Sequence, residues 1–183
     1  MIKFLKKHYS NILFLLVLGL LLFPSTRVYF IRLISFSPSV NEVKEQVHLD
    51  SYEWNLKGLN AQNINFKEEK GKVIFVSFWA TWCPPCIAEL PSIKKLHQDY
   101  GNKVSFLLVT NEDWGTVSKF YEKNEYNFPT YNYVSAVPSK LQSNSIPATF
   151  ILDKSGKIIV DKKGPANWNT EKIRSLLDDL LAK

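Results

Sequence analysis

The chain has 183 residues, of which 45% are hydrophobic and 14% aromatic, and this composition excludes an intrinsically disordered protein. Its net charge of +6 comes from the N-terminus, because residues 1–36 hold five basic side chains and no acidic one. The remainder holds 18 basic and 17 acidic residues, so we expect no nucleic-acid partner.

The N-terminus predicts a membrane anchor. Three lysines within the first seven residues precede the apolar run Ile12–Phe23, and no charge occurs from Tyr9 to Thr26. As a helix, that uncharged stretch spans roughly 27 Å, close to the thickness of the hydrocarbon layer. Basic residues before the run favour a cytoplasmic N-terminus. The expected location is therefore the cytoplasmic membrane, crossed once, with the C-terminal domain on the periplasmic or extracytoplasmic side.

Two alternatives to the anchor remain open. One is a cleaved signal peptide, although residues 22–26 offer no small-x-small cleavage site. The other is a buried helix of a soluble domain. Both the anchor and the signal peptide export the domain into an oxidising compartment, where a disulfide persists.

We expect three segments. Residues 1–36 form a cytoplasmic tip, a transmembrane anchor and a juxtamembrane piece, in which Val28–Phe36 lies at the membrane surface or extends the anchor. Residues 37–50 form a linker, and residues 51–183 form one α/β domain.

Within this domain, hydrophobic patterns predict strands and helices in alternation. His48–Phe66 reads as a hairpin, followed by a charged turn at Lys67–Lys72. Strands are expected at Val73–Trp79, Val104–Thr110, Ala148–Leu152 and Ile158–Val160, with an extended segment or loop at Asn127–Val134. Helices are expected at Cys86–Tyr100, kinked at Pro91, at Gly115–Lys123, and at Thr170–Leu181, with Thr170 as N-cap. This order predicts a mixed sheet with helices on both faces.

The only two cysteines, Cys83 and Cys86, lie between a buried strand and a helix. This spacing indicates a reversible dithiol/disulfide site. The helix N-terminus favours a thiolate at Cys83, so we expect Cys83 to be the exposed nucleophile and Cys86 the buried resolving thiol. The disulfide itself is the redox centre, and we expect no bound cofactor and no metal.

Pro84 and Pro85 separate the two cysteines, and neither has a backbone N–H. The Cys83 sulfur therefore keeps chiefly the N–H of Cys86 as a donor. Because a less stabilised thiolate makes a better reductant, we expect this site to donate electrons.

Three further groups complete the predicted site. Glu89 follows Cys86 by three residues on the same side of the helix and, if buried, could accept its proton. Pro147 should begin the strand Ala148–Leu152, and with Ile146 it could pair with a bound substrate chain. Trp82 could line a substrate surface, while Trp79 should lie in the core. From spacing alone, a solvated Glu89 and a trans Pro147 remain open.

The runs Phe78–Cys86 and Ile146–Phe150, with Pro91 between them, resemble the thioredoxin superfamily, and above all its TlpA/ResA-like branch. The resemblance covers roughly Tyr52 to Lys183. It implies a thioredoxin-like fold, a cis Pro147 opposite the dithiol, and an active-site acid at Glu89. Ser77 stands where cytosolic thioredoxins carry a buried aspartate, which favours Glu89 as the proton acceptor.

We therefore expect a membrane-anchored thiol–disulfide oxidoreductase. We expect it to reduce disulfides of exported proteins. The resemblance implies apocytochrome c as one target and a membrane electron donor that re-reduces the protein. One alternative is an oxidase or isomerase of secreted proteins. A metal-binding module is another, but one CxxC supplies only two ligands and the three histidines adjoin no ligand pattern.

Overall fold

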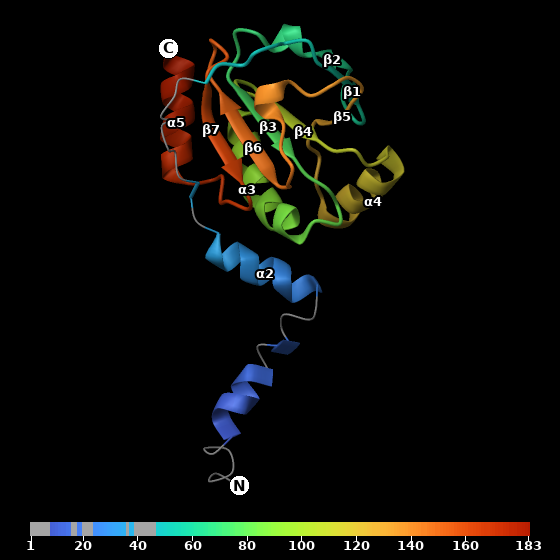
Figure 1. Cartoon of the computed structure of the whole chain (residues 1–183), viewed down its shortest axis with the longest axis vertical. Helices are drawn as coiled ribbons and strands as arrows, with labels where there is room; N and C mark the ends of the chain where they lie inside the picture. Colours follow the sequence, from blue (N-terminus) through green and yellow to red (C-terminus); the bar gives the residue numbers. More distant parts are fainter. Residues whose placement is uncertain (1–7, 16–17, 20–23, 36, 39–46) are drawn as a thin grey trace.

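The structure is a computed structural model of the chain, and it describes residues 8–15, 18–19, 24–35, 37–38 and 47–183. A seven-stranded sheet forms its centre, in the order β2-β1-β5-β4-β3-β6-β7 (Figure 1). The strands are β1 (Asn55–Gly58), β2 (Ile64–Asn65), β3 (Ile74–Phe78), β4 (Ser105–Val109), β5 (Thr130–Tyr133), β6 (Ala148–Leu152) and β7 (Ile158–Lys163). The helices are α2 (Pro24–Ile34), α3 (Pro84–Tyr100), α4 (Trp114–Asn124) and α5 (Glu171–Ala182), with short 3₁₀ turns η1 (Phe66–Glu69) and η2 (Ser139–Leu141).

The sheet is mixed, as predicted. Central strand β3 runs parallel to β4 and antiparallel to β6, and its residues are almost wholly buried. The predicted hairpin is confirmed, because β1 and β2 pair antiparallel. The segment expected to be extended or a loop contains β5, which pairs parallel to β4 and antiparallel to β1. The hairpin therefore joins the rest of the sheet through β5.

The prediction of helices on both faces is wrong for the described residues. One core cluster contains the buried side chains of α3, α4 and α5 together with Phe75, Leu108 and Ile151. The steps from β3 to β4 and from β4 to β5 move in the same direction across the sheet. Right-handed crossovers in one direction place both connecting helices on the same face.

The opposite face is covered by the hairpin and the 3₁₀ turns. Its core cluster includes Trp54, Phe66 and Leu141 against Ile74 and Phe150 of the sheet. Alternate residues of β3 thus serve two cores: Phe75 and Ser77 point to the helical side, and Ile74 and Val76 to the other. This parity places Ser77 beneath α3.

Local signals at the C-terminus are confirmed. Thr170 is the N-cap of α5, and its hydroxyl accepts a hydrogen bond from the N–H of Ile173. Ile173, Leu177 and Leu180 of this helix are buried, while Leu176 is partly buried against the same cluster. In the turn between β6 and β7, Gly156 has a φ of +83°, which favours glycine. The kink at Pro91 remains a prediction.

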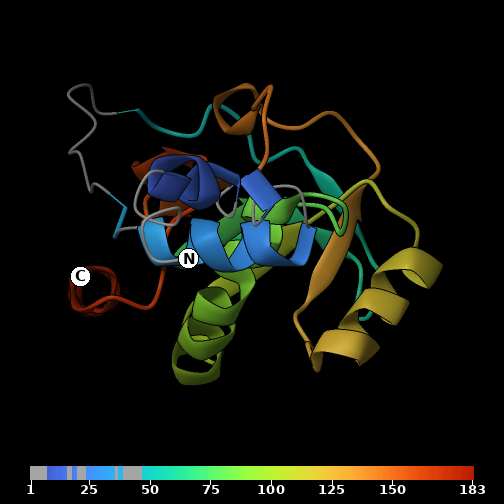
Figure 2. The same ribbon diagram turned by 90° about the horizontal axis from the view of Figure 1, so that it is seen from below.

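Helix α2 packs across α3 on the outside of the domain (Figures 1 and 2). The Nε of Arg32 donates to the carbonyl oxygen of Ala88 at 3.3 Å. Just beyond α2, the hydroxyls of Ser37 and Thr170 lie 2.9 Å apart. Helix α2, which covers most of the segment predicted to lie at the membrane surface, therefore contacts the domain next to the cysteine motif.

The predicted anchor lies partly outside the described residues, as does most of the predicted linker 37–50. Residues 8–15 are helical. Among the residues that the structure describes, no helix combines the length and the apolarity needed to cross a membrane.

Candidate active site

Cys83 and Cys86 form a disulfide at the start of α3. Cys83 is the N-cap of this helix, with an extended backbone, and its Sγ accepts a hydrogen bond from the N–H of Cys86 at 3.2 Å. Pro84 and Pro85 occupy the first two helical positions and have no N–H to offer. The expectation that Cys86 supplies the donor to this sulfur is confirmed.

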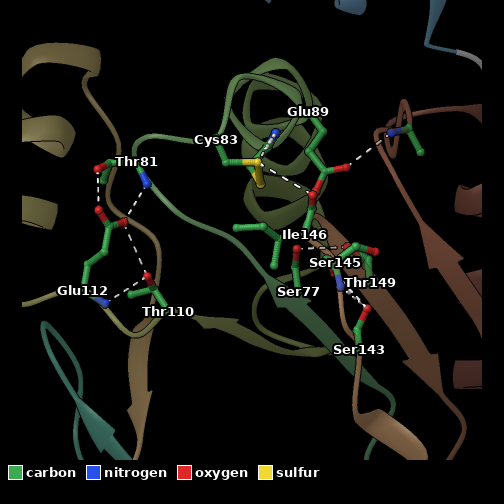
Figure 3. Close-up of a disulfide and its surroundings, with 12 residues drawn as sticks. Ser77, Thr81, Cys83, Glu89, Thr110, Glu112, Ser143, Ser145, Ile146 and Thr149 are labelled. Atoms are coloured by element: carbon green, nitrogen blue, oxygen red, sulfur yellow. Dashed lines mark hydrogen bonds between the residues drawn. A yellow bond between two sulfur atoms is a disulfide. The ribbon is translucent and has the colours of Figure 1, made fainter.

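The expected exposure of Cys83 is wrong for this disulfide form. Cys83 is only 3% exposed, and Cys86 is fully buried. Both sulfurs are drawn into the N-terminal turn of α3, and the carbonyl oxygen of Ile146 lies 3.9 Å from the Cys83 Sγ (Figure 3). Neither sulfur is therefore open to solvent in this disulfide form.

The peptide bond between Ile146 and Pro147 is cis, as the family resemblance implied. Pro147 is buried and directly precedes β6, where the sequence placed it. Its carbonyl oxygen accepts a hydrogen bond from the N–H of Gly164 at 2.9 Å. Ile146 and Cys83, which were predicted from two distant motifs, lie face to face (Figure 3).

Trp82 is 68% exposed, whereas Trp79 is buried in the core, as predicted. An open groove of about 300 Å³ begins at Trp82 and Ile146 and lies over the carboxyl ends of β3 and β4. None of the side chains that line it is charged; they include Phe78, Asn111, Tyr133, Leu141 and Ser143. The groove offers aromatic, aliphatic and amide contacts next to the disulfide.

Glu89 is buried on α3, one turn beyond Cys86. Burial raises the pKa of its carboxyl group to about 8, and this outweighs the opposing hydrogen bonds and the positive charge of Lys162. Its Oε2 accepts hydrogen bonds from the indole N–H of Trp168 at 3.1 Å and from the N–H of Ala166 at 3.3 Å. The open alternative of a solvated carboxylate is therefore wrong, and Glu89 is mainly protonated at neutral pH in this disulfide form.

Ser77 also lowers the pKa of Glu89. Its hydroxyl, however, makes no hydrogen bond of normal geometry with Oε1, which has no partner among the described residues. Ser77 therefore acts on Glu89 as a nearby dipole. Ser77 instead accepts a hydrogen bond from the hydroxyl of Thr149 at 2.9 Å.

Sequence reasoning missed several residues around the site. The carboxylate of Glu112 accepts hydrogen bonds from the N–H and the hydroxyl of Thr81, at 2.6 and 2.7 Å (Figure 3). This pair holds the loop that leads to Cys83. Trp168, which binds Glu89, was also missed. Both contacts join residues far apart in the chain, so no local spacing could have indicated them.

The chain is similar to known redox proteins. The Redoxin family matches residues 37–180. The thioredoxin-like protein YneN of Bacillus subtilis is 28% identical over 158 residues, which cover 84% of this chain and 88% of YneN. The thiol-disulfide oxidoreductase ResA of Bacillus thuringiensis subsp. konkukian is 27% identical over 145 residues, which cover 78% of this chain and 80% of ResA.

Solved structures show the same fold. A putative thiol:disulfide interchange protein DsbE from Chlorobium tepidum has a TM-score of 0.61 at 20% identity, covering 75% of this chain and 99% of its own. StoA from Bacillus subtilis has a TM-score of 0.51 at 24% identity, covering 70% of this chain and 95% of its own. The likeness thus supports the fold described above.

Proposed function

We propose that this protein reduces disulfides outside the cytoplasm. The chain belongs to the Redoxin family and to the TlpA/ResA-like branch of the thioredoxin superfamily, and it is a thiol–disulfide oxidoreductase. The substrates are disulfides of exported proteins, with apocytochrome c as one candidate. The observation that carries the proposal is the disulfide at the helix N-terminus, with one N–H donor on Cys83 and a buried acid, Glu89, behind it.

The reaction begins with the dithiol form. The Cys83 thiolate attacks one sulfur of the substrate disulfide, and a mixed disulfide forms as the other substrate sulfur leaves. Cys86 then gives its proton to the Glu89 carboxylate and attacks the Cys83 sulfur, which releases the second substrate sulfur. Two electrons pass to the substrate, and the enzyme is left as the Cys83–Cys86 disulfide with a protonated Glu89.

The raised pKa of Glu89 fits this end state. A carboxyl group with a pKa of about 8 holds its proton in the oxidised enzyme at neutral pH. When a membrane electron donor reduces the disulfide again, Glu89 can return that proton to the Cys86 sulfur. The group is thus suited to store one proton between the two halves of the cycle.

The groove beside the disulfide suits an extended, uncharged stretch of substrate. Trp82 offers a large exposed apolar surface, and Ile146 presents its carbonyl oxygen beside the Cys83 sulfur. We assign Trp82, Ile146 and Pro147 to substrate binding on this basis. The apolar N-terminal run supports an anchor that keeps the domain on the outer side of the cytoplasmic membrane.

The reduction potential of the full-length chain tests the direction of electron flow. Equilibration with thiol/disulfide buffers should give a potential nearer to that of thioredoxin, about −270 mV, than to that of a strong oxidant, about −120 mV. A value near the latter would assign the chain to the alternative function, oxidation of secreted proteins.

A substrate trap tests the site. Cys86→Ala should accumulate mixed disulfides with exported proteins, because the resolving thiol is missing. The double variant Cys83→Ala/Cys86→Ala is the control and should capture none. Equal capture by both variants would show that Cys83 is not the nucleophile.

A further inference from the structure

The loop between β7 and α5, residues 164–170, reaches over the buried carboxylate of Glu89. Two N–H groups of this loop, from Ala166 and from the Trp168 indole, bond to one and the same oxygen, Oε2. The other oxygen, Oε1, is buried and has no hydrogen-bond partner among the described residues. The two oxygens of Glu89 are therefore not equivalent.

This asymmetry has a chemical consequence. A carboxyl oxygen that accepts two N–H bonds uses its lone pairs as acceptor, and a proton on it would point at these N–H groups. The proton of the neutral acid must then sit on Oε1. Since Oε1 has no hydrogen-bond partner in the part of the chain that the structure describes, it is also the oxygen that is free to exchange a proton.

We propose that Trp168 is a positioning residue: with Ala166 it commits Oε2 of Glu89 to accepting hydrogen bonds, so that Oε1 alone takes up and returns the proton of Cys86. The proposal rests on the proposed function for the identity of the proton donor. The indole N–H of Trp168, which orients the acid, lies 79 residues away from Glu89 in the chain.

Trp168 is itself held firmly against the site. It is fully buried, and its ring meets the Phe75 ring edge-on, with centroids 5.2 Å apart. Its backbone N–H donates to the Ser92 hydroxyl at 3.0 Å, and that hydroxyl donates to the carbonyl oxygen of Glu89 at 2.7 Å. Trp168 is therefore linked to the helix that carries Glu89 through its backbone N–H as well as through its indole N–H.

Several groups face Glu89 and act on its proton affinity. Lys162 on β7 lies on the same side of the sheet, and its charge favours the carboxylate. Ser77 of β3 acts in the same sense, while Thr149 of β6 is bonded to Ser77 and carries no charge. On α3, Cys83 and Cys86 titrate only after reduction. A test in the disulfide form thus isolates Glu89 from the thiols.

The experiment uses the full-length oxidised protein and Trp168→Phe, which keeps an aromatic ring but removes the indole N–H. Infrared spectroscopy follows the carbonyl band of the protonated acid with pH, and Glu89→Gln identifies the band by its loss. In the wild type the band should disappear with a midpoint of about 8. In Trp168→Phe the proton affinity of Glu89 should rise about tenfold, because the carboxylate loses one of two donors.

Trp54→Phe is the matched control. It also removes a buried indole N–H, but this group has no hydrogen-bond partner among the described residues and lies in the other core cluster. The control should leave the midpoint unchanged. The proposal is wrong if Trp168→Phe titrates like the wild type, or if Trp54→Phe moves the midpoint equally.

A second measurement needs no substitution at Trp168. In the folded wild type, the NMR resonance of the Trp168 indole N–H should shift with pH at the Glu89 midpoint, and the shift should vanish in Glu89→Gln. A resonance whose chemical shift does not change at this midpoint would overturn the proposal. Neither readout requires turnover. If the protein reduced no disulfide, the proposed function would be refuted, but the role of Trp168 could still be measured.

Discussion

The hydroxyl of Thr149 donates to that of Ser77 at 2.9 Å, inside the core and beneath the helix that carries the disulfide. Both positions belong to central strands paired in register. The sheet therefore places a neutral hydroxyl pair, and no carboxylate, at this position. Glu89 of α3 supplies the buried acid from the helix side.

Glu89 should make the oxidised protein less stable as the pH rises. Its pKa is raised by burial from 4.5 to about 8, so its stabilising contribution is complete below pH 4.5 and is lost as the pH rises through 8. The loss should be roughly 3–5 kcal/mol in free energy of unfolding. Urea unfolding at several pH values measures it. Glu89→Gln should remove most of this pH dependence, whereas exposed Glu171→Gln should retain it.

Pro85→Ala should make the protein a weaker reductant. Residue 85 is the second helical position, whose N–H can reach the side chain of an N-cap residue such as Cys83. One added bond to the thiolate, at about 1.5–3 kcal/mol, should raise the reduction potential by about 30–60 mV. Pro84→Ala is the control, because an N–H at the first helical position does not point at the cap. Equal potentials for the two variants would contradict this reasoning.

Trp82→Ala should weaken the binding of protein substrates and leave the stability of the fold unchanged. The side chain is 68% exposed, so its loss should alter the free energy of unfolding by less than about 0.5 kcal/mol. An aromatic anchor at an interface contributes about 1–2 kcal/mol, so kcat/KM for a disulfide-containing protein should fall roughly 5- to 30-fold. Trp114→Ala on α4 removes a second partly exposed indole and should have little effect on kcat/KM.

Glu112→Ala should loosen the loop before Cys83. Its carboxylate accepts two bonds from Thr81, and the N–H of Thr81 loses its partner when the carboxylate is removed. We expect the free energy of unfolding to fall by about 2–3 kcal/mol, measured by urea unfolding. Glu122→Ala, at an exposed position of α4, should change it by less than about 0.5 kcal/mol. Hydrogen exchange at Thr81 should accelerate only in the first variant.

Several features followed from the sequence. The order of strands and helices, the cysteine pair at a helix start and the N-cap at Thr170 all rest on local patterns, and local patterns act over a few residues in any tertiary context. Pro147 was placed at the start of a strand for the same reason, while its cis bond followed only from the family resemblance. Glu89 could be assigned to the cysteine side of its helix from its spacing alone.

Only the tertiary structure decided how these pieces meet. The order of strands in the sheet, which spacing does not encode, placed all three domain helices on one face. It buried Cys83 beside Ile146, and it brought Trp168 onto Glu89 across 79 residues of chain. Such contacts depend on which strands pair and in which register. For that reason the sequence determined the chemistry of the cysteine pair, while packing decided which oxygen of Glu89 accepts its hydrogen bonds.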